Sequence, residues 1–447
     1  MNEATKSHNW TRYLLVLSIA IPLLILLLIA NSSLLVVGLW FWLAAVLAGT
    51  AVYLLAGSFR SPAPPLPPKL AAEPRMLVGE DQPQVIRDIM DIHIAFEQGG
   101  VKVFRGKLRV PGDAALSKLK EGLPSDVVPQ LQGDEHQNAV IALMPKPAGQ
   151  PAAARTSGTW INWALLGLTL ITTTWTGALY QGVDLLQHPW HFTVGLPYAL
   201  GLLAILGVHE LGHYFMARHH GIDVTPPYFI PVPFGLGTFG AFIKMRSPAE
   251  NRRALFDVAV AGPLAGLAVA IPALLIGLRT STIVPMANLS LPYLSGGASV
   301  GSSILLALLS KLSLGNALQY GCVVRLSPLA FAGWLGLLVT ALNLLPIGQL
   351  DGGHIATAMF GYRASRNIST LAMAALFFLA IFVWPTLLVW AIVVFFLAGR
   401  ESPPLDDYTP LMPEQQWLGY AAFAILLLIL LPLPHALWSN LGIHCIG

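Results

Sequence analysis

The chain has 447 residues, of which 55% are hydrophobic and only 11% are charged. Because soluble domains carry about 25% charged residues, this composition excludes an ordinary soluble protein and predicts a chain that crosses a membrane several times. The net charge of +3 is small, so we expect the lipid bilayer, and no nucleic acid, as a partner. Two cysteines, Cys322 and Cys445, are too few for a disulfide framework or a thiolate metal site.

The N-terminal part, residues 1–60, contains two apolar runs of spanning length, 13–30 and 34–56, separated by three polar residues. This pattern predicts a transmembrane hairpin. A cleavable signal peptide fits less well, because the second run follows at once and no small-residue cleavage site is evident. Lysine and arginine flank both ends of the hairpin, which predicts a cytoplasmic N-terminus.

A proline-rich linker, residues 61–81, separates the hairpin from the only soluble-looking stretch, residues 82–144. Its apolar spacing predicts a small α+β domain. Catalysis is not expected there, because His93 and His136 have no matching ligands nearby in the sequence and are expected to have a surface or packing role. A substrate filter or regulatory platform is the functional alternative. The elements expected there are a helix over 85–96, a strand over 101–109, a helix over 114–121 and a strand over 139–144. A second linker, residues 145–159, follows.

Residues 160–447 are predicted to form a membrane-embedded domain with its functional core at about 193–361. The predicted spans are 160–180, 193–217, 254–278, 328–345, 369–399 and 417–432. The stretch 369–399 is interrupted by Pro385 and forms either one long tilted span or two short ones. The fold class expected is therefore a polytopic α-helical membrane protein with eight or nine transmembrane helices.

The fourth predicted span carries His209, Glu210 and His213 in the pattern H-E-x-x-H. Histidines four residues apart lie on one helix face, about one turn apart, and can bind one metal ion. In zinc proteases with this pattern the imidazoles hold Zn²⁺ and the glutamate takes a proton from water. The residues before the motif, 192–208, carry no formal charge, and ionisable groups at bilayer depth usually mark a functional site.

A third ligand is needed, because a catalytic zinc takes three protein ligands and keeps one position open. Asp351 is the leading candidate: it follows the sixth span, on the side of the membrane where the histidines are expected, and Gly352 and Gly353 would allow close backbone approach. Asn343 could donate a hydrogen bond to the oxyanion or the substrate backbone, or could serve as a structural cap. His354 is disfavoured as a fourth ligand, because a closed site would lose its water.

Residues 228–243 are too short and too rich in proline and glycine to span a membrane. We expect a re-entrant extended hairpin beside the fourth span, here called the metal helix, where it could hold an unwound substrate by β-augmentation; the alternative is an apolar loop without substrate contact.

In the fifth span, Gly262 and Gly266 form a G-x-x-x-G step that predicts close packing against the metal helix.

These motifs together resemble the site-2 protease family of intramembrane zinc metalloproteases. The resemblance is carried by His209-Glu-Leu-Gly-His213, by Ala261-Gly-Pro-Leu-Ala-Gly266 and by the stretch from Asn343 to Asp351-Gly-Gly353. Pro227-Tyr-Phe-Ile-Pro231 and the run from Phe234 to Phe242 are especially similar to the EGY-type branch of chloroplasts and cyanobacteria, which has bacterial relatives. The resemblance implies zinc on His209, His213 and Asp351, with Glu210 as the base.

The resemblance also implies membrane-protein substrates, in some cases single-span proteins already cut once, such as anti-sigma factors. The sequence departs from the family in two places. It has no PDZ-like domain between the fourth span and the Asp351 motif, and Gly106-Lys-Leu-Arg109 has lysine where the EGY-type pattern has asparagine. The expected location is the inner membrane of a bacterium, with the site open to the cytoplasm, or a plastid or thylakoid membrane in a plant.

The function expected is therefore intramembrane hydrolysis of peptide bonds in regulated proteolysis. Two alternatives are a catalytically silent relative that binds membrane proteins and a transporter with a metal site. The silent relative would typically have lost Glu210. The transporter would show inverted repeats and polar residues along several spans, and neither is visible in the sequence.

Overall fold

The computed structural model describes residues 75–124, 126–133, 138–145, 160–285, 303–318, 322–382, 387–397, 399 and 403–434. The chain divides into two compact units, residues 1–66 and 67–447, and every described residue belongs to the second. The predicted N-terminal hairpin lies outside the described residues, as do most of the proline-rich linker and all of the second linker except Pro145.

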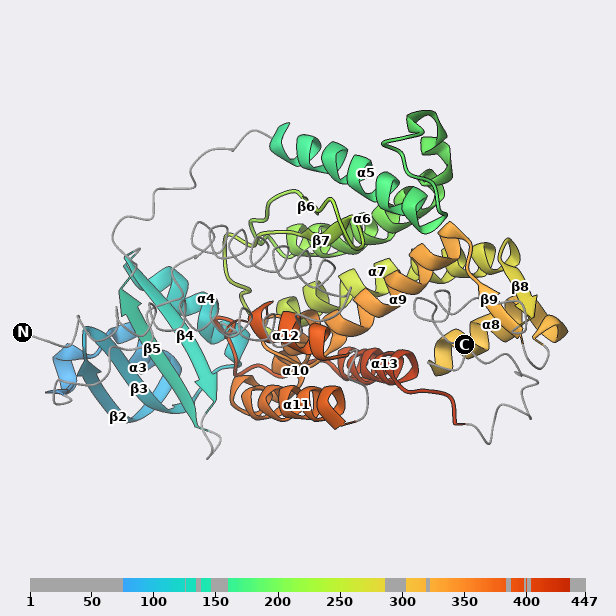
Figure 1. Ribbon diagram of the computed structural model, residues 1–447. Helices are drawn as coiled ribbons and strands as arrows, with labels where there is room; N and C mark the ends of the chain where they lie inside the picture. Colours follow the sequence, from blue (N-terminus) through green and yellow to red (C-terminus); the bar gives the residue numbers. More distant parts are fainter. Residues whose placement is uncertain are drawn as a thin grey trace, which may run out of the picture. The chain divides into compact units, whose positions relative to one another are not determined.

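The stretch predicted to be a soluble domain folds as a five-stranded antiparallel sheet with strand order β1-β2-β3-β5-β4 and two helices (Figure 1). Its core is a separate cluster that includes Ile86, Phe104 and Ile141, all fully buried. The elements are β1 Arg75–Met76, α3 Gln84–Ile89, β2 Met90–Gln98, β3 Val101–Leu108, α4 Gly112–Gly122, β4 Val127–Gly133 and β5 Ala139–Pro145. The predicted α+β character is confirmed.

Two predictions in this domain were wrong in detail. The helix expected over 85–96 ends at Ile89, and the chain continues as β2. The buried residues of β2 are Met90 and Ala95, which are five residues apart because the register shifts between Ile92 and Ile94. An odd separation breaks the two-residue period by which a strand is recognised in a sequence. Strand β4 was not predicted, because Pro129 lies within it and proline is unusual inside a sheet.

The Gly106-Lys-Leu-Arg109 stretch has a structural role in the ladder between β2 and β3. A Cβ atom at Gly106 would lie 1.8 Å from the carbonyl oxygen of Asp91, so only glycine fits beside the bulge. Arg109 Nε donates a hydrogen bond of 2.9 Å to Asp91 Oδ1. This hydrogen bond holds the pKa of the Asp91 carboxyl below its usual value.

The remaining described chain is mostly helical (Figure 1). Its helices are α5 Trp160–Tyr180, α6 Leu196–His219, α7 Arg252–Arg279, α8 Ile304–Leu314, α9 Pro328–Leu344, α10 Asp351–Phe360, α11 Tyr362–Phe382, α12 Leu387–Leu397 and α13 Pro413–Leu430. Its strands form two antiparallel two-stranded sheets. One is the hairpin of β6 Tyr228–Pro231 with β7 Thr238–Phe242, and the other pairs β8 Thr282–Pro285 with β9 Cys322–Arg325, which follows α8.

Three described helices, α6, α7 and α11, are long and apolar enough to cross a membrane. Helices α5, α9 and α13 form at the other predicted places without meeting that criterion, so the count of eight or nine spans is not confirmed. The stretch 369–399 falls into two helices, α11 and α12, which pack against each other. Of the two, only α11 is long and apolar enough to count as a span, so the choice between one long span and two short ones stays a prediction.

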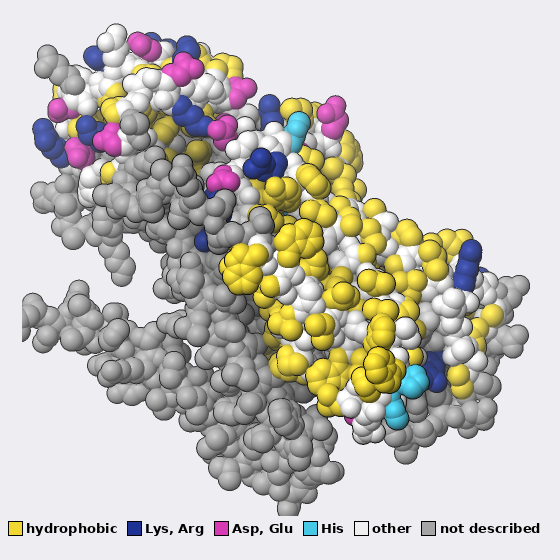
Figure 2. Space-filling model, turned by 90° about the horizontal axis from the view of Figure 1, so that it is seen from above, with side chains coloured by type: hydrophobic (Ala, Val, Ile, Leu, Met, Phe, Trp, Pro, Cys, Tyr) yellow, Lys and Arg dark blue, Asp and Glu magenta, His cyan; other side chains and the backbone are white. Residues whose placement is uncertain are grey.

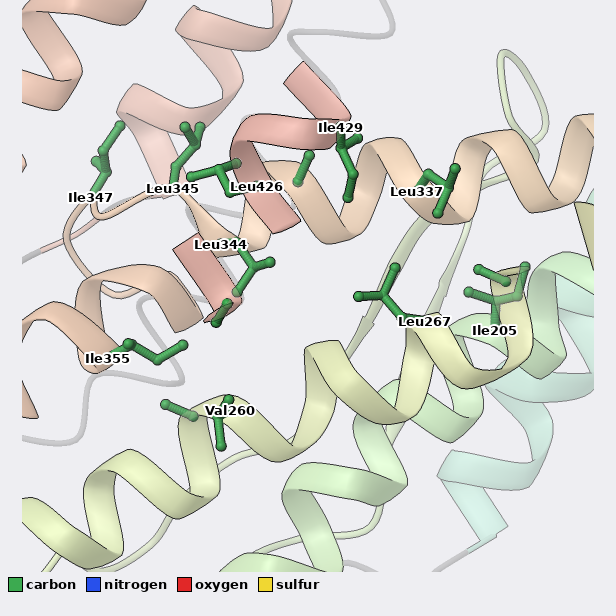
Figure 3. Packing of buried hydrophobic residues seen from close by; sticks show 14 of the residues in the cluster. Ile205, Val260, Leu267, Leu337, Leu344, Leu345, Ile347, Ile355, Leu426 and Ile429 are labelled. Carbon is green, nitrogen blue, oxygen red and sulfur yellow. The ribbon is translucent and has the colours of Figure 1, made fainter. Parts of the chain in front are cut away.

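Helices α6, α7 and α9 pack side by side and form the centre of the bundle (Figure 1). Figure 3 shows side chains from these helices meeting in the largest apolar cluster, among them Ile205, Leu267 and Leu337. Glycines permit this proximity: a Cβ at Gly336 would lie 2.9 Å from two atoms of Ile205. The close packing of these three helices makes this part of the protein rigid, and it holds in place the polar side chains of α6 and α9 that are described below.

The outer surface of the bundle is also apolar. Figure 2 shows a face on which hydrophobic side chains form a broad, nearly continuous surface, with charged side chains gathered toward one end. On α5, the exposed side chains include Trp163 and Ile171, at 71% and 65%, and on α11 they include Leu371 at 72%. Such extensive exposed apolar surface is typical of a protein embedded in lipid.

Candidate metal centre

His209 and His213 lie one turn apart on α6, as their spacing predicted, and both side chains are buried. Their Nε2 atoms are 3.1 Å apart. The third residue, Asp351, comes from a different part of the chain and is the first residue of α10. Its two carboxylate oxygens lie 3.2 Å from His209 Nε2 and 3.3 Å from His213 Nε2.

The backbone around Asp351 explains how the carboxylate reaches the histidines. A Cβ at Gly352 would lie 2.0 Å from the carbonyl oxygen of Leu344, and one at Gly353 would lie 2.1 Å from that of Gly348. The start of α10 therefore packs directly on the turn that follows α9, as the glycine pair predicted. A carboxylate is also favoured at a helix N-terminus by the helix dipole.

These three residues are the one His, Cys, Asp and Glu cluster with metal-binding geometry among the described residues. In a tetrahedral site with bonds of about 2.0–2.1 Å, neighbouring ligand atoms lie roughly 3.3–3.4 Å apart. The separations of 3.1, 3.2 and 3.3 Å are close to this value. The Asp351 side chain is 16% exposed, against 5% for His209 and 8% for His213, so the group is most accessible from its aspartate side.

The tautomer of His213 also fits a metal ligand. Its Nδ1–H donates a hydrogen bond of 2.8 Å to the carbonyl oxygen of Val258 on α7, which leaves the Nε2 lone pair directed at the other ligand atoms. Ligating histidines commonly donate their second ring N–H to a carbonyl oxygen in this way. Asp351 Oδ2 is buried without a hydrogen-bond partner in the described part of the chain, as expected for an oxygen that contacts a cation.

Helix α7 presents its G-x-x-x-G step to the two imidazole rings. A Cβ at Gly262 would lie 2.0 Å from His213 Nε2, and one at Gly266 would lie 3.1 Å from His209 Nδ1. From the other side, a Cβ at Gly212 of α6 would lie 2.7 Å from the carbonyl oxygen of Ala261. The predicted packing of the step against the metal helix is therefore confirmed, and its glycines leave room for the imidazoles.

Glu210 is buried on α6 and close enough to both histidines and Asp351 to interact with all three electrostatically. The backbone amide of Ile243, which follows β7, faces its carboxylate. Asn343 near the end of α9 also reaches the group, with Nδ2 lying 3.3 Å from His209 Nε2. All five residues that the sequence singled out are therefore brought together.

The hairpin of β6 and β7 is anchored beside this group by polar side chains of α5 and α6. Thr172 donates a hydrogen bond of 2.7 Å to the carbonyl oxygen of Gly237, and the Tyr198 hydroxyl donates one of 2.8 Å to that of Leu236. Near the start of β6, Asn162 donates to the carbonyl oxygens of Pro226 and Pro227. The extended hairpin was predicted; its anchors were not.

Two contributions to the site were not predicted from the sequence. The carbonyl oxygen of Val258 carries no sequence signal, since every residue has one. The run of threonines from Thr172 to Thr174 was visible as a polar cluster within an apolar helix, and it could have indicated that this face of α5 contacts backbone.

A buried His-His-Asp group with a glutamate beside it, set in an apolar helical bundle, is a group that could hold one metal ion, and such an arrangement is typical of mononuclear metallohydrolases. Residues 197–383 match the model of peptidase family M50.

Comparison with curated proteins finds relatives that are named as probable zinc metalloproteases. The chain is 34% identical over 353 residues to the "Probable zinc metalloprotease EGY2, chloroplastic" of Oryza sativa subsp. indica, which covers 75% of this chain and 62% of that protein. It is 37% identical over 251 residues to the EGY1 protein of Arabidopsis thaliana, covering 56% of this chain and 45% of that protein. The chain thus spans less than two thirds of the length of these relatives. The resemblance to site-2 proteases of the EGY type is confirmed.

Proposed function

We propose that this chain is an intramembrane zinc metalloprotease that hydrolyses peptide bonds within or next to the transmembrane segments of membrane proteins. The observation that carries the proposal is the convergence of His209, His213 and Asp351 at 3.1–3.3 Å, with Glu210 beside them. The relatives are named zinc metalloproteases, which supports zinc as the metal.

In this proposal His209, His213 and Asp351 hold the zinc ion. Zinc in such a site supplies Lewis-acid chemistry, which activates water and polarises a carbonyl group. Glu210 acts as the base: its carboxylate accepts a proton from the attacking water and passes it to the nitrogen of the leaving amine. We propose that the Asn343 amide donates a hydrogen bond to the substrate's carbonyl oxygen as charge develops there; its position 3.3 Å from His209 Nε2 supports this role.

The hairpin is proposed to bind the substrate. A peptide bond inside a helix is protected by the helix, so a substrate must unwind before it is cut, and the free edge of a strand can pair with the unwound segment. Of the two hairpin strands, β6 has the more extensive contact with α5, so β7 is proposed as the strand that pairs with the substrate. Because Ile243 follows β7 and faces Glu210, a substrate strand paired with β7 would lead directly to the base.

The substrates are proposed to be membrane proteins, including single-span proteins cut once beforehand, in the manner of regulated intramembrane proteolysis. The location proposed is a multi-pass membrane position with the N-terminus and the opening of the site on the cytoplasmic side. The relatives are named chloroplastic, which supports a plastid membrane if the chain comes from a plant, with the inner membrane as the equivalent in a bacterium.

The test is cleavage of a panel of single-span membrane proteins by purified protein in detergent, with bound zinc quantified in parallel. Glu210→Gln should retain stoichiometric zinc and lose cleavage by about 10²–10⁴-fold, because only the proton acceptor is removed. Glu414→Gln, an exposed position at the start of α13, is the matched control and should behave as wild type.

Each alternative predicts a different result. A wild-type protein that holds zinc but cuts none of the panel, with or without a prior cut in the substrate, would favour the silent membrane-protein binder. A wild-type protein that moves zinc across vesicle membranes without cleaving would favour the transporter. Full activity in Glu210→Gln would remove the assigned base.

A further inference from the structure

We propose that Arg252 is a positioning residue for the metal centre, because it ties α10, and with it Asp351, to α7. This inference rests on the proposed metal ligands. Arg252 is the first residue of α7 and touches none of the three ligands itself. Its side chain is only 12% exposed, which is unusual for arginine and calls for specific partners.

Those partners are at the far end of the helix that Asp351 begins. Arg252 Nε donates a hydrogen bond of 2.7 Å to the carbonyl oxygen of Ala358, and Nη2 donates one of 2.8 Å to that of Met359. Both carbonyls belong to the last turn of α10, where four backbone oxygens lack partners within the helix. A cation at this end is also favoured by the helix dipole.

A second set of contacts stabilises the C-terminal end of α10, where the chain continues into α11. Asp407 Oδ1 lies 3.9 Å from Arg252 Nε, and Asp407 Oδ2 accepts a hydrogen bond of 3.2 Å from the amide of Tyr362, the first residue of α11. The backbone turns between α10 and α11 at Gly361, whose φ is +81°. The guanidinium is therefore held where α7, α10 and α11 meet.

The consequence for the metal centre follows from the shape of α10. The helix has ten residues and is about 15 Å long, so it behaves as a short rigid rod. Its first turn packs on the backbone of Leu344 and Gly348, and its last turn is held by Arg252. If the last turn is released, the rod can tilt or slide, and the Asp351 carboxylate moves relative to the histidines.

Helix α7 is also the element that orients the histidines. The carbonyl oxygen of Val258 fixes the ring of His213, and Gly262 and Gly266 form the wall behind both rings. Through Arg252, the same helix determines where Asp351 lies. The ligands on α6 and the ligand on α10 are therefore both positioned by α7, which itself contributes no ligand.

The test is the zinc dissociation constant of the full chain in detergent, measured by competition with a chromophoric chelator. Arg252→Gln should weaken zinc binding about 10–100-fold, the range seen when partners of metal ligands are removed. Arg252→Lys should recover part of this loss, since it keeps the charge but lacks the two-pronged geometry of the guanidinium. The matched control is Arg253→Gln, which removes the neighbouring charge and a bond to the Pro410 carbonyl oxygen only.

A double-mutant cycle separates positioning from general loss of stability. If Arg252 acts through Asp351, adding Arg252→Gln to Asp351→Asn should weaken zinc binding by less than twofold beyond Asp351→Asn alone. Equal losses in both backgrounds, or wild-type affinity in Arg252→Gln, would overturn the inference. A wild-type protein that does not bind zinc would instead overturn the proposed function, so the two failures are distinguishable.

If Arg252→Gln folds poorly, the role of Arg252 can be tested with the Arg252→Lys protein, in which zinc is replaced by cobalt. The visible absorption of bound Co²⁺ depends on the ligand set, so a displaced Asp351 should shift the spectrum of Arg252→Lys toward that of Asp351→Asn. A wild-type cobalt spectrum together with wild-type zinc affinity in Arg252→Lys would contradict the proposed role.

Discussion

Replacing Gly262 by alanine is the most direct test of the metal centre, because it alters no ligand. The new Cβ would lie 2.0 Å from His213 Nε2 and 2.4 Å from both neighbouring ring carbons. Carbon contacts below 3.0 Å essentially never occur, so the ring must retreat by about 1 Å, whereas metal–ligand distances tolerate only about 0.2 Å. We therefore expect Gly262→Ala to lose His213 as a ligand.

The expected magnitude is a loss of zinc affinity of at least about 100-fold, equivalent to about 2.7 kcal/mol. Gly266→Ala provides a graded comparison, since its Cβ would lie 3.1 Å from His209 Nδ1 and needs a shift of only a few tenths of an ångström. We expect a loss of at most about tenfold there. Gly167→Ala on α5, with no atom within 4 Å of the new Cβ, is the control and should bind zinc as wild type.

The assay is chelator competition on purified protein in detergent, with thermal unfolding of the metal-free protein as a check on folding. The order of affinities should be Gly167→Ala, then Gly266→Ala, then Gly262→Ala. A folded Gly262→Ala protein that binds zinc within twofold of wild type would refute the assignment of His213 Nε2 as the binding atom.

Three further predictions concern the soluble domain and the hairpin. Gly106→Ala should destabilise the soluble domain by roughly 2 kcal/mol, because its Cβ would overlap the Asp91 carbonyl oxygen; limited proteolysis of the full chain would measure this, and an unchanged cleavage rate would contradict it. The hydrogen bond from Arg109 lowers the pKa of Asp91, so its stabilising contribution is present above the unfolded pKa of about 3.9 and is lost as the pH falls through the lower folded value. Asp91→Asn should remove that part of the pH dependence of unfolding, measured by circular dichroism; an identical pH profile would argue against the pair. Thr172→Val and Tyr198→Phe should raise KM or move the cleavage position while leaving bound zinc unchanged, as checked by mass spectrometry of the products. Unaltered kinetics and cleavage position in both would weigh against a substrate role for the hairpin.

The metal group could be predicted from the sequence because few residue types bind zinc and their spacing on a helix is restrictive. His209 and His213 follow from the helical period alone. The prediction of Asp351 needed one further argument. Its carboxylate follows the sixth predicted span, which crosses the membrane in the same direction as the metal helix and so ends on the same side. Glycines next to it indicated close backbone approach, and the structure agrees: a Cβ added at Gly352 or Gly353 would lie 2.0 or 2.1 Å from a carbonyl oxygen.

The soluble domain was harder to predict for a physical reason. Residues 85–96 are apolar at positions that suit a helix as far as Ile89 and a strand beyond it, and the bulge near His93 breaks the two-residue alternation that would have revealed β2. Strand β4 contains Pro129 and lies at the edge of the five-stranded sheet, where its outer side bonds to residues 405–407. Pairing with a segment so distant in sequence has no local signal.

The arrangement of α7 explains how a metal site can be held rigidly when its ligands come from two separate helices. Val258, Gly262 and Gly266 are four residues apart, so they share one face of α7, and that face packs against α6 and its histidines. Arg252 is six residues before Val258, which places it about 120° around the helix, on the side that reaches α10. Helix α7 therefore lies between the two ligand-bearing helices and contacts each with a different face. Since ligand distances must hold to about 0.2 Å, substitutions on either face should alter zinc binding, whereas loss of a surface contact such as that of Arg253 should not.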